Sequence, residues 1–293
     1  MKAHIIKDPK YDYLRVEPIP TQEEVEAFYA KEFYDSNAKY FNNSSLLLQK
    51  EQSDFFDARW ESIYQTASEF FGPEFPKTSV FDIGFGFAQA LKYFKSKGLK
   101  VSGLEPSPEG VAYAKSNGIN TFHSGIENFD VVGDEKFEMV MLLNVLEHLR
   151  EPEKTILNVK ENLLTKNGLF VIEVPNDFND FQEVANKEYD LDEWWVLPPN
   201  HINYFSHDSL QKLLRGCGFR IVEATSLFPL DIFLLFGDQY VGNPLIGREC
   251  HNKRVNFERL MDKHGKSDKL KELYKALARL NLGRSVVIYA TPE

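Results

Sequence analysis

Two glycines and two acids in the first half of the sequence have types and a spacing that suit ligand binding. An apolar run that contains Asp82 meets a turn with Gly84 and Gly86, and a helical pattern follows. Glycine has no Cβ, so the backbone can turn tightly and let a ligand come close. Glu105 ends the next apolar run about 20 residues later, where a carboxylate can accept hydrogen bonds from two adjacent ribose hydroxyls. These residues predict a nucleotide-type cradle; glycines that only pack a turn, and an acid that only faces solvent, are the structural alternatives.

A second polar group follows the strongly apolar run Phe137–Leu143. Asn144 and Val145 come directly after this run, and Glu147 and His148 follow them. A plain connection between a strand and a helix does not need adjacent Glu and His side chains. The pattern therefore favours a reaction cleft at this place, and a His148 that only bonds a backbone carbonyl is the alternative.

A third group lies in a loop rich in acids and aromatic residues. His201 stands shortly before Ser206, which is suited to cap the next helix. His201 could take a proton from a substrate hydroxyl, or it could be an architectural residue that bonds its proline-rich loop. Trp194 and Trp195 could stack on a ring or fasten the loop to the core.

The elements that must position these groups alternate in type. Apolar and helical periodicities predict strands at 79–83, 100–104, 120–123, 137–143, 169–174, 219–225 and 285–290, and helices at 56–71, 87–96, 108–116, 152–164, 206–216, 252–262 and 267–279. A turn is expected at Asn167–Gly168, and a short N-terminal helix from Thr21 to about Tyr29, where Thr21 and Glu24 form a capping-box pattern. Alternation of this kind predicts a parallel sheet with helices on both faces, whose ligands bind at the carboxyl ends of the strands.

Composition excludes several classes of protein. The 293 residues carry a formal charge of −10, which repels phosphate backbones, so we expect no nucleic-acid partner. Cys217 and Cys250 have no metal-type spacing, and we expect a reduced, cytoplasmic setting. The N-terminus lacks the apolar run of a signal peptide, and the most apolar later stretch, Ile232–Phe236, is too short to span a bilayer. No membrane association is expected.

With the three groups in place, the chain resembles class I S-adenosylmethionine-dependent methyltransferases, and is most similar to those that act on quinones and sugars. Their first motif has an acid followed by three small residues at alternate positions, here Gly84, Gly86 and Ala88 after Asp82. A nicotinamide-binding fingerprint would want glycine in place of Gln89. The segment from Asn144 resembles the family's fourth motif.

The resemblance implies S-adenosyl-L-methionine as the cofactor and assigns residues to the site. The cofactor would lie against Asp82, Gly84, Phe85, Gly86, Glu105, Pro106, Ile126, Glu127, Asn144 and Val145. His201 and His148 are the candidate catalytic residues, and His207 also lies near the expected cleft. No metal triad is apparent in the spacing, so no metal is predicted.

The expected fold class is α/β, a doubly wound, Rossmann-like sheet of seven strands, mostly parallel with an antiparallel last strand. Residues 1–52 would form an N-terminal cap segment and 53–293 the methyltransferase domain, with substrate-cap insertions at about 176–205 and 228–283. The expected activity is methyl transfer to a small polar metabolite, with a sugar hydroxyl as the first guess. An NAD(P)-dependent oxidoreductase and a non-catalytic cofactor-binding scaffold stay as alternatives.

The second insertion leaves two questions open. Between Arg248 and Arg284, eleven Lys or Arg stand against five Asp or Glu, which could face an anionic substrate or be a solvated helix face. The apolar run ahead of it could line a pocket or form a subunit interface, so a homodimer also stays open.

Overall fold

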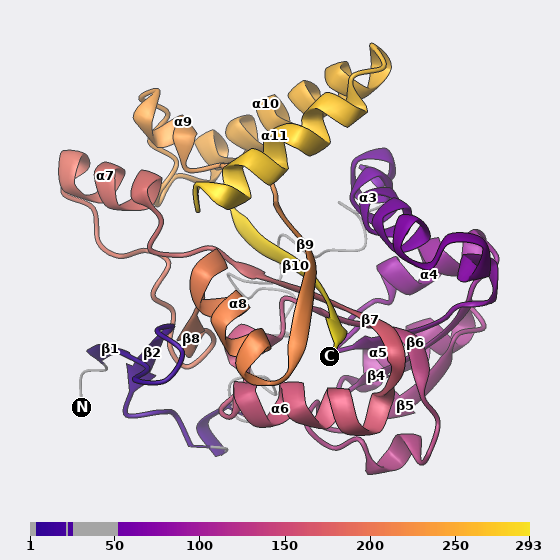
Figure 1. The fold of residues 1–293 in the computed structure, drawn as a ribbon. Helices are drawn as coiled ribbons and strands as arrows, with labels where there is room; N and C mark the ends of the chain where they lie inside the picture. Colours follow the sequence, from indigo (N-terminus) through magenta and orange to yellow (C-terminus); the bar gives the residue numbers. More distant parts are fainter. Residues whose placement is uncertain (1–3, 22, 26–51) are drawn as a thin grey trace.

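A seven-stranded sheet is the core of the described chain, which the computed structural model gives for residues 4–21, 23–25 and 52–293 (Figure 1). Its strands are β3 (Ser79–Ile83), β4 (Lys100–Glu105), β5 (Asn120–His123), β6 (Phe137–Leu143), β7 (Leu164–Pro175), β9 (Phe219–Ser226) and β10 (Ser285–Pro292). Their order is β5-β4-β3-β6-β7-β10-β9. The pairs from β5 to β7 are parallel, and β10 is antiparallel to β7 and β9. The predicted α/β class and the antiparallel last strand are confirmed.

Helices cover both faces of this sheet. They are α3 (Ser53–Phe71), α4 (Gln89–Ser96) and α5 (Pro108–Ser116) on one face, and α6 (Pro152–Asn158) and α8 (His207–Gly216) on the other. Successive strand residues point to opposite faces, so Val80 of β3 packs in the α3–α5 cluster and Phe81 in the α6–α8 cluster. Both residues are fully buried, as expected for a parallel sheet covered on both sides.

The predicted helix caps are confirmed. The Ser206 side chain accepts a hydrogen bond from the backbone N–H of Ser209, whose hydroxyl accepts from the backbone N–H of Ser206. Thr21 and Glu24 make the equivalent pair, at 2.7 and 3.2 Å. The remainder of that N-terminal helix, with Tyr29, lies outside the described residues.

A small sheet at the N-terminal side was not predicted. It joins β1 (His4–Lys7) and β2 (Leu14–Glu17) to β8 (Asn203–Tyr204), all antiparallel. Strands this short have little periodicity of their own, and β8 comes from a distant part of the chain. The sequence analysis had found no regular strand in either segment.

Several predicted boundaries were wrong. The 176–205 insertion contains α7 (Asp180–Tyr189), whose cap Asn179 accepts from two backbone N–H groups. The predicted helix after Pro152 changes to a π-helical turn, η6 (Val159–Leu163). The predicted turn at Asn167–Gly168 lies inside β7 instead, where a register shift in the β6–β7 pairing absorbs the irregularity.

The 228–283 insertion is more helical than predicted. It contains α9 (Ile232–Leu235), α10 (Pro244–Lys263) and α11 (Ser267–Arg279), of which α11 matches its prediction and α10 starts earlier. The early start follows from Asn243, whose side chain caps the first turn, and from a proline in that turn. Figure 1 shows α10 and α11 side by side, beyond the edge that holds β9. None of the helices in the described ranges has the length and apolar character needed to cross a bilayer.

Candidate active site

Glu105 stabilises the glycine turn through hydrogen bonds. Its two carboxylate oxygens accept hydrogen bonds from the backbone N–H groups of Gly86, at 2.8 Å, and Ser107, at 2.9 Å. Gly84 and Gly86 have φ values of +73° and +54°, a region that favours glycine. Glu105 is 2% exposed, so the alternative of a solvated acid is wrong. The carboxylate and the turn form one unit at the ends of β3 and β4.

Three sequence-predicted residues from separate segments meet beside this turn. A Cβ on Gly84 would lie 2.7 Å from Val145 Cγ2 and 3.0 Å from Ile126 Cδ1. Asn144, next to Val145, has a φ of +55° and donates its backbone N–H to the carbonyl of Glu173 at 2.7 Å. The ends of β3 and β6 and the loop after β5 therefore share one edge, as ligand sites of open α/β sheets do.

The side chains of Asp82 and Phe85 point into the protein. Burial raises the pKa of Asp82 well above its usual value, and the Glu105 carboxylate raises it further, while Arg59 opposes the shift. Phe85 packs in the core, because a Cβ on Gly103 would lie 2.6 Å from its ring. A contact of Phe85 with a ligand would therefore come from its backbone.

Pro106 and Glu127 lie at the side of this edge. The carbonyl of Pro106 is 3.0 Å from Nε2 of His123. The exposed Glu127 accepts a hydrogen bond of 3.4 Å from the Thr155 hydroxyl, which directs it toward α6. Of the predicted cofactor residues, Glu127 has the weakest structural link to the glycine turn.

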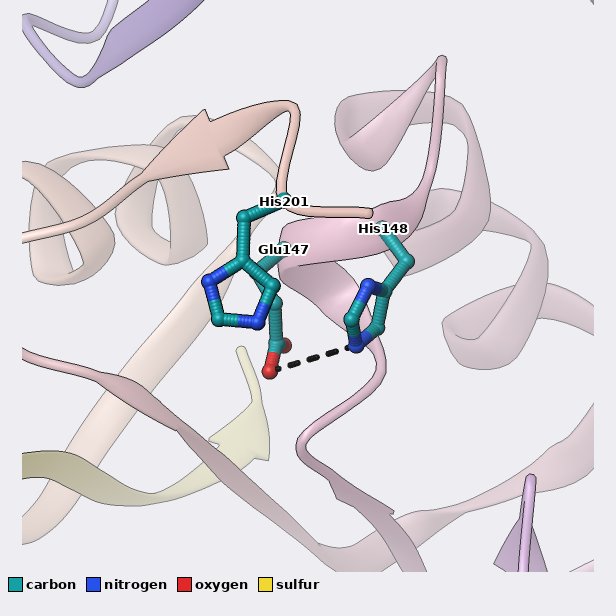
Figure 2. A group of neighbouring side chains, drawn as sticks. All are labelled: Glu147, His148 and His201. Carbon is teal, nitrogen blue, oxygen red and sulfur yellow. Dashed lines mark ion pairs between the residues drawn. The ribbon is translucent and has the colours of Figure 1, made fainter. Parts of the chain in front are cut away.

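The two candidate catalytic histidines are in contact. The ring centroids of His148 and His201 are 5.0 Å apart, in an edge-to-face arrangement. His148 Nε2 also lies 3.6 Å from Oε1 of Glu147 (Figure 2). His148 and Glu147 belong to the 3-10 turn η5 (Leu146–His148), and His201 comes from the loop before β8. In Figure 2, a nitrogen of each ring is turned toward the Glu147 carboxylate.

Backbone hydrogen bonds hold this loop against η5. Nδ1 of His148 is 2.7 Å from the carbonyl oxygen of Asn200. The backbone N–H of Ile202 donates to the carbonyl of Glu147 at 3.0 Å, and the Asn203 amide donates to the carbonyl of Leu149 at 2.6 Å. The alternative role for His148, bonding a backbone carbonyl, is thus observed, and it also fixes the ring's orientation.

Burial keeps the paired imidazoles neutral. It lowers the pKa of His148 to about 4, against an opposing effect of hydrogen bonds to the Asn200 and Asn144 backbones. Burial, followed by the charges of His148 and Arg284, lowers the pKa of His201 to about 3. Burial also lowers the pKa of His207 to about 4, but no hydrogen bond or ring contact among the described residues joins His207 to the pair.

The sequence analysis missed a buried charged network behind His201. Asp177 lies 3.9 Å from His201 Nδ1 and 3.2 Å from Arg284 Nη1. Asp231 is 3.8 Å from the same guanidinium and accepts a hydrogen bond from the Tyr240 hydroxyl. The position of Asp177 just after β7 was an available signal, but partners so far along the chain could not be assigned from spacing.

The tryptophan pair fastens the loop to the small sheet. Trp195 is buried with Val16 and Tyr204, and its ring packs edge-on against Phe178 at 5.4 Å and Trp194 at 4.6 Å. These contacts favour the architectural role over stacking on a substrate.

Six of the eleven basic residues between Arg248 and Arg284 have acidic partners among the described residues. The ion pairs are Lys253–Asp238, Arg254–Glu258, Arg259–Asp54, Lys271–Glu69, Lys275–Glu223 and Arg284–Asp177. A cavity of about 470 Å³ lies between α3, the α10–α11 pair and the sheet. Its lining includes Glu173 but none of the predicted cofactor residues or the paired histidines. Local ion pairing therefore accounts for most of the basic excess.

Comparisons with known proteins agree with this geometry. Residues 55–224, more than half of the chain, match a family described as a methyltransferase domain. Two curated relatives are named ubiquinone biosynthesis O-methyltransferase: one from Rickettsia conorii is 29% identical over 106 residues, and one from Rickettsia canadensis is 26% identical over 162 residues. These matches cover 34% and 52% of this chain, and 36% and 66% of the relatives, so the chain spans less than two thirds of either.

A solved structure shares the fold. The plantazolicin methyltransferase BamL, in complex with a triazolic desmethylPZN analog and SAH, has a TM-score of 0.54 and 15% identity, covering 92% of this chain and 97% of that one. At this identity the likeness shows the fold alone. The family match is evidence for function as well as fold. It favours a methyltransferase over a nicotinamide-dependent oxidoreductase. The chain belongs to the methyltransferase-domain family, as its resemblance to class I S-adenosylmethionine-dependent methyltransferases implies.

Proposed function

We propose that this protein transfers the methyl group of S-adenosylmethionine to a hydroxyl oxygen of a small polar molecule, with sugars as the first acceptors to test. The observation that carries the proposal is the short turn from Asn144 to His148. Val145 lies against Gly84 of the predicted cofactor cradle, and His148, three residues later, contacts His201. The names of the two curated relatives also support an oxygen acceptor.

Methyl transfer from a sulfonium is a direct displacement. The donor is already activated, so the protein mainly aligns the acceptor oxygen with the methyl carbon and excludes water. A hydroxyl must also lose its proton at or before attack. The two buried imidazoles are neutral at pH 7 because burial lowers the pKa of both. They are the groups we assign to assist that deprotonation.

The first experiment is calorimetric titration of the full chain with S-adenosylhomocysteine. Micromolar binding supports the cofactor cradle, and binding without methyl transfer to any acceptor would favour the non-catalytic scaffold. The second experiment follows labelled methyl transfer to a panel of sugars and phenols. His201→Ala should lower kcat and leave the Kd for S-adenosylhomocysteine nearly unchanged.

A second histidine variant, away from the site, shows whether a loss of turnover in His201→Ala is specific to the site. His251 is another partly buried histidine, on α10, where its Nε2 donates a hydrogen bond of 2.7 Å to the side-chain oxygen of Gln52. His251→Asn should retain turnover. If His201→Ala fails to fold, the role of His201 is architectural; if it folds with unchanged kcat, the assignment of His201 to the reaction is wrong.

A further inference from the structure

Glu147, His148 and His201 are arranged as ligands of a metal ion. One potential ligand atom from each, a carboxylate oxygen and two ring nitrogens, lies within 4.8 Å of both others (Figure 2). Around a four-coordinate ion with bonds of about 2.1 Å, ligand atoms stand about 3.4 Å apart. The observed Glu147–His148 separation of 3.6 Å is already close to that value.

The Glu147 carboxylate needs a partner that the described residues do not supply. It is 2% exposed, and its Oε2 accepts no hydrogen bond from any residue of the described ranges. The Glu147 backbone N–H donates to this carboxylate, but a buried carboxylate oxygen without a donor is energetically costly, and Asp177 and Glu173 add negative charge nearby. A proton or a cation would relieve this. A cation fits better, because two imidazoles turn nitrogens toward the same carboxylate (Figure 2).

The surroundings of the histidines match those of metal ligands. Nδ1 of His148 lies 2.7 Å from the carbonyl oxygen of Asn200, and its Nε2 lies 3.6 Å from Oε1 of Glu147. Nδ1 of His201 faces the buried carboxylate of Asp177 at 3.9 Å. Metal-bound histidines usually have a carbonyl or carboxylate at the second ring nitrogen, which fixes tautomer and orientation.

We infer that Glu147, His148 and His201 bind a divalent first-row transition-metal ion that positions the acceptor hydroxyl for methyl transfer. Two imidazoles and one carboxylate favour zinc, iron, cobalt or manganese over magnesium and calcium, which prefer oxygen ligands. Three protein ligands leave coordination positions open. They suit an acceptor with a hydroxyl and a second oxygen on the adjacent carbon, a pair found in vicinal diols and catechols.

The inference rests on the proposed methyl transfer and gives the proton a route. A hydroxyl held by a divalent cation loses its proton to solvent more readily. The oxygen then forms a bond to the methyl carbon, and the carbon–sulfur bond breaks with its electron pair on sulfur, giving the neutral thioether S-adenosylhomocysteine. In this scheme the two imidazoles assist the deprotonation as ligands of the ion rather than as bases, and the proton goes to water.

The test is metal binding by the full chain, stripped with a chelator and dialysed. Calorimetric titrations with Zn²⁺, Mn²⁺ and Mg²⁺, each alone, should give one ion per chain, with Mg²⁺ the weakest. Glu147→Gln and His201→Asn should each weaken Zn²⁺ binding at least tenfold, while His251→Asn binds as the wild type does. S-adenosylhomocysteine binding and the melting temperature show that each variant is folded; two ligand variants are made so that one failure to fold does not end the test.

The outcomes separate this inference from the proposed function. Zn²⁺ binding that is equal in the wild type and in either folded ligand variant overturns the metal site and leaves methyl transfer standing. One ion per chain that both ligand variants lose supports the site. A bound ion whose removal leaves kcat unchanged contradicts the role in positioning the acceptor. A bound ion in a protein that methylates no acceptor counts against the proposed function alone.

Discussion

Replacing Gly86 by alanine tests where the cofactor lies. Gly86 has a φ of +54°, and Gly72, at the end of α3, has a φ of +58°. Apart from the adjoining residues in the chain, a Cβ at either position would meet no atom of the described residues within 4 Å. Both Gly→Ala changes place a side chain at a positive φ, which costs about 1–3 kcal/mol. Urea unfolding should therefore show a loss of unfolding free energy in this range for Gly86→Ala and for Gly72→Ala.

The two variants should differ in cofactor affinity. If the cofactor approaches the backbone at Gly86, the added methyl overlaps it, and crowding of that kind costs about 1–3 kcal/mol. This corresponds to an increase of about 5- to 150-fold in Kd. Gly72 comes before the start of β3, whereas Gly86 follows its carboxyl end. Gly72→Ala should therefore keep the wild-type Kd for S-adenosylhomocysteine. Calorimetric titration with S-adenosylhomocysteine measures both.

Gly84→Ala provides a graded comparison. Its Cβ would meet Val145 at 2.7 Å and Ile126 at 3.0 Å, in addition to the strain of a positive φ. Its loss of unfolding free energy should exceed that of Gly86→Ala. The reasoning is refuted if Gly86→Ala and Gly72→Ala bind S-adenosylhomocysteine equally well, because the space beside Gly86 would then not be the cofactor's.

Three further changes test other parts of the site and its supports. Glu105→Ala removes the acceptor for the buried N–H of Ser107 and the partly buried N–H of Gly86. A buried N–H left unpaired costs about 1–3 kcal/mol, so the change should weaken S-adenosylhomocysteine binding at least tenfold by calorimetry; unchanged affinity would exclude Glu105 from the site. Ser206→Ala should reduce the free energy of unfolding in urea by about 1 kcal/mol through the lost cap, with cofactor affinity retained, and a combined loss of both would contradict a purely local role. Burial and then Glu105 raise the folded-state pKa of Asp82 above its ordinary value of 3.8, so the folded protein holds this proton more tightly and wild-type stability falls as pH rises from that value toward the raised one. Asp82→Asn removes this penalty, so its stability relative to wild type should increase between pH 4 and pH 7 in urea unfolding, and a constant difference would show that the carboxyl does not titrate in this window.

The parts of the fold that the sequence predicted well have strong periodicity. β3, β5 and β6 begin and end at the predicted residues. For β3 and β6 this is because each is a short apolar run with clear breaks on both sides. The helix α7 was missed because its ten residues mix acids with few apolar positions, and only Ala185 and Gln182 are buried. Its stability depends on packing and on its cap more than on a hydrophobic face.

Some residues of the candidate site could also be predicted from the sequence, and others could not. Glu105 was identifiable because its distance along the chain from the glycine turn is set by one strand–helix–strand unit. The grouping of Glu147 with His201 was not, because the two residues meet only through tertiary contacts between η5 and a loop far along the sequence. Metal-type spacing in the sequence reports ligands that share one local element, and this group does not.

The N-terminal strands have a direct structural link to the paired histidines. The carbonyl of Ile202 accepts a hydrogen bond of 2.9 Å from Val16 of β2, and the N–H of Ile202 donates to the carbonyl of Glu147 at 3.0 Å. Consecutive backbone bonds therefore connect β2, the His201 loop and η5. Since His201 immediately precedes Ile202, a shift of β2 would move His201 relative to His148. The small sheet thus helps to hold the imidazole pair in register, which accounts for a sheet formed from the N-terminal strands and a segment far along the chain.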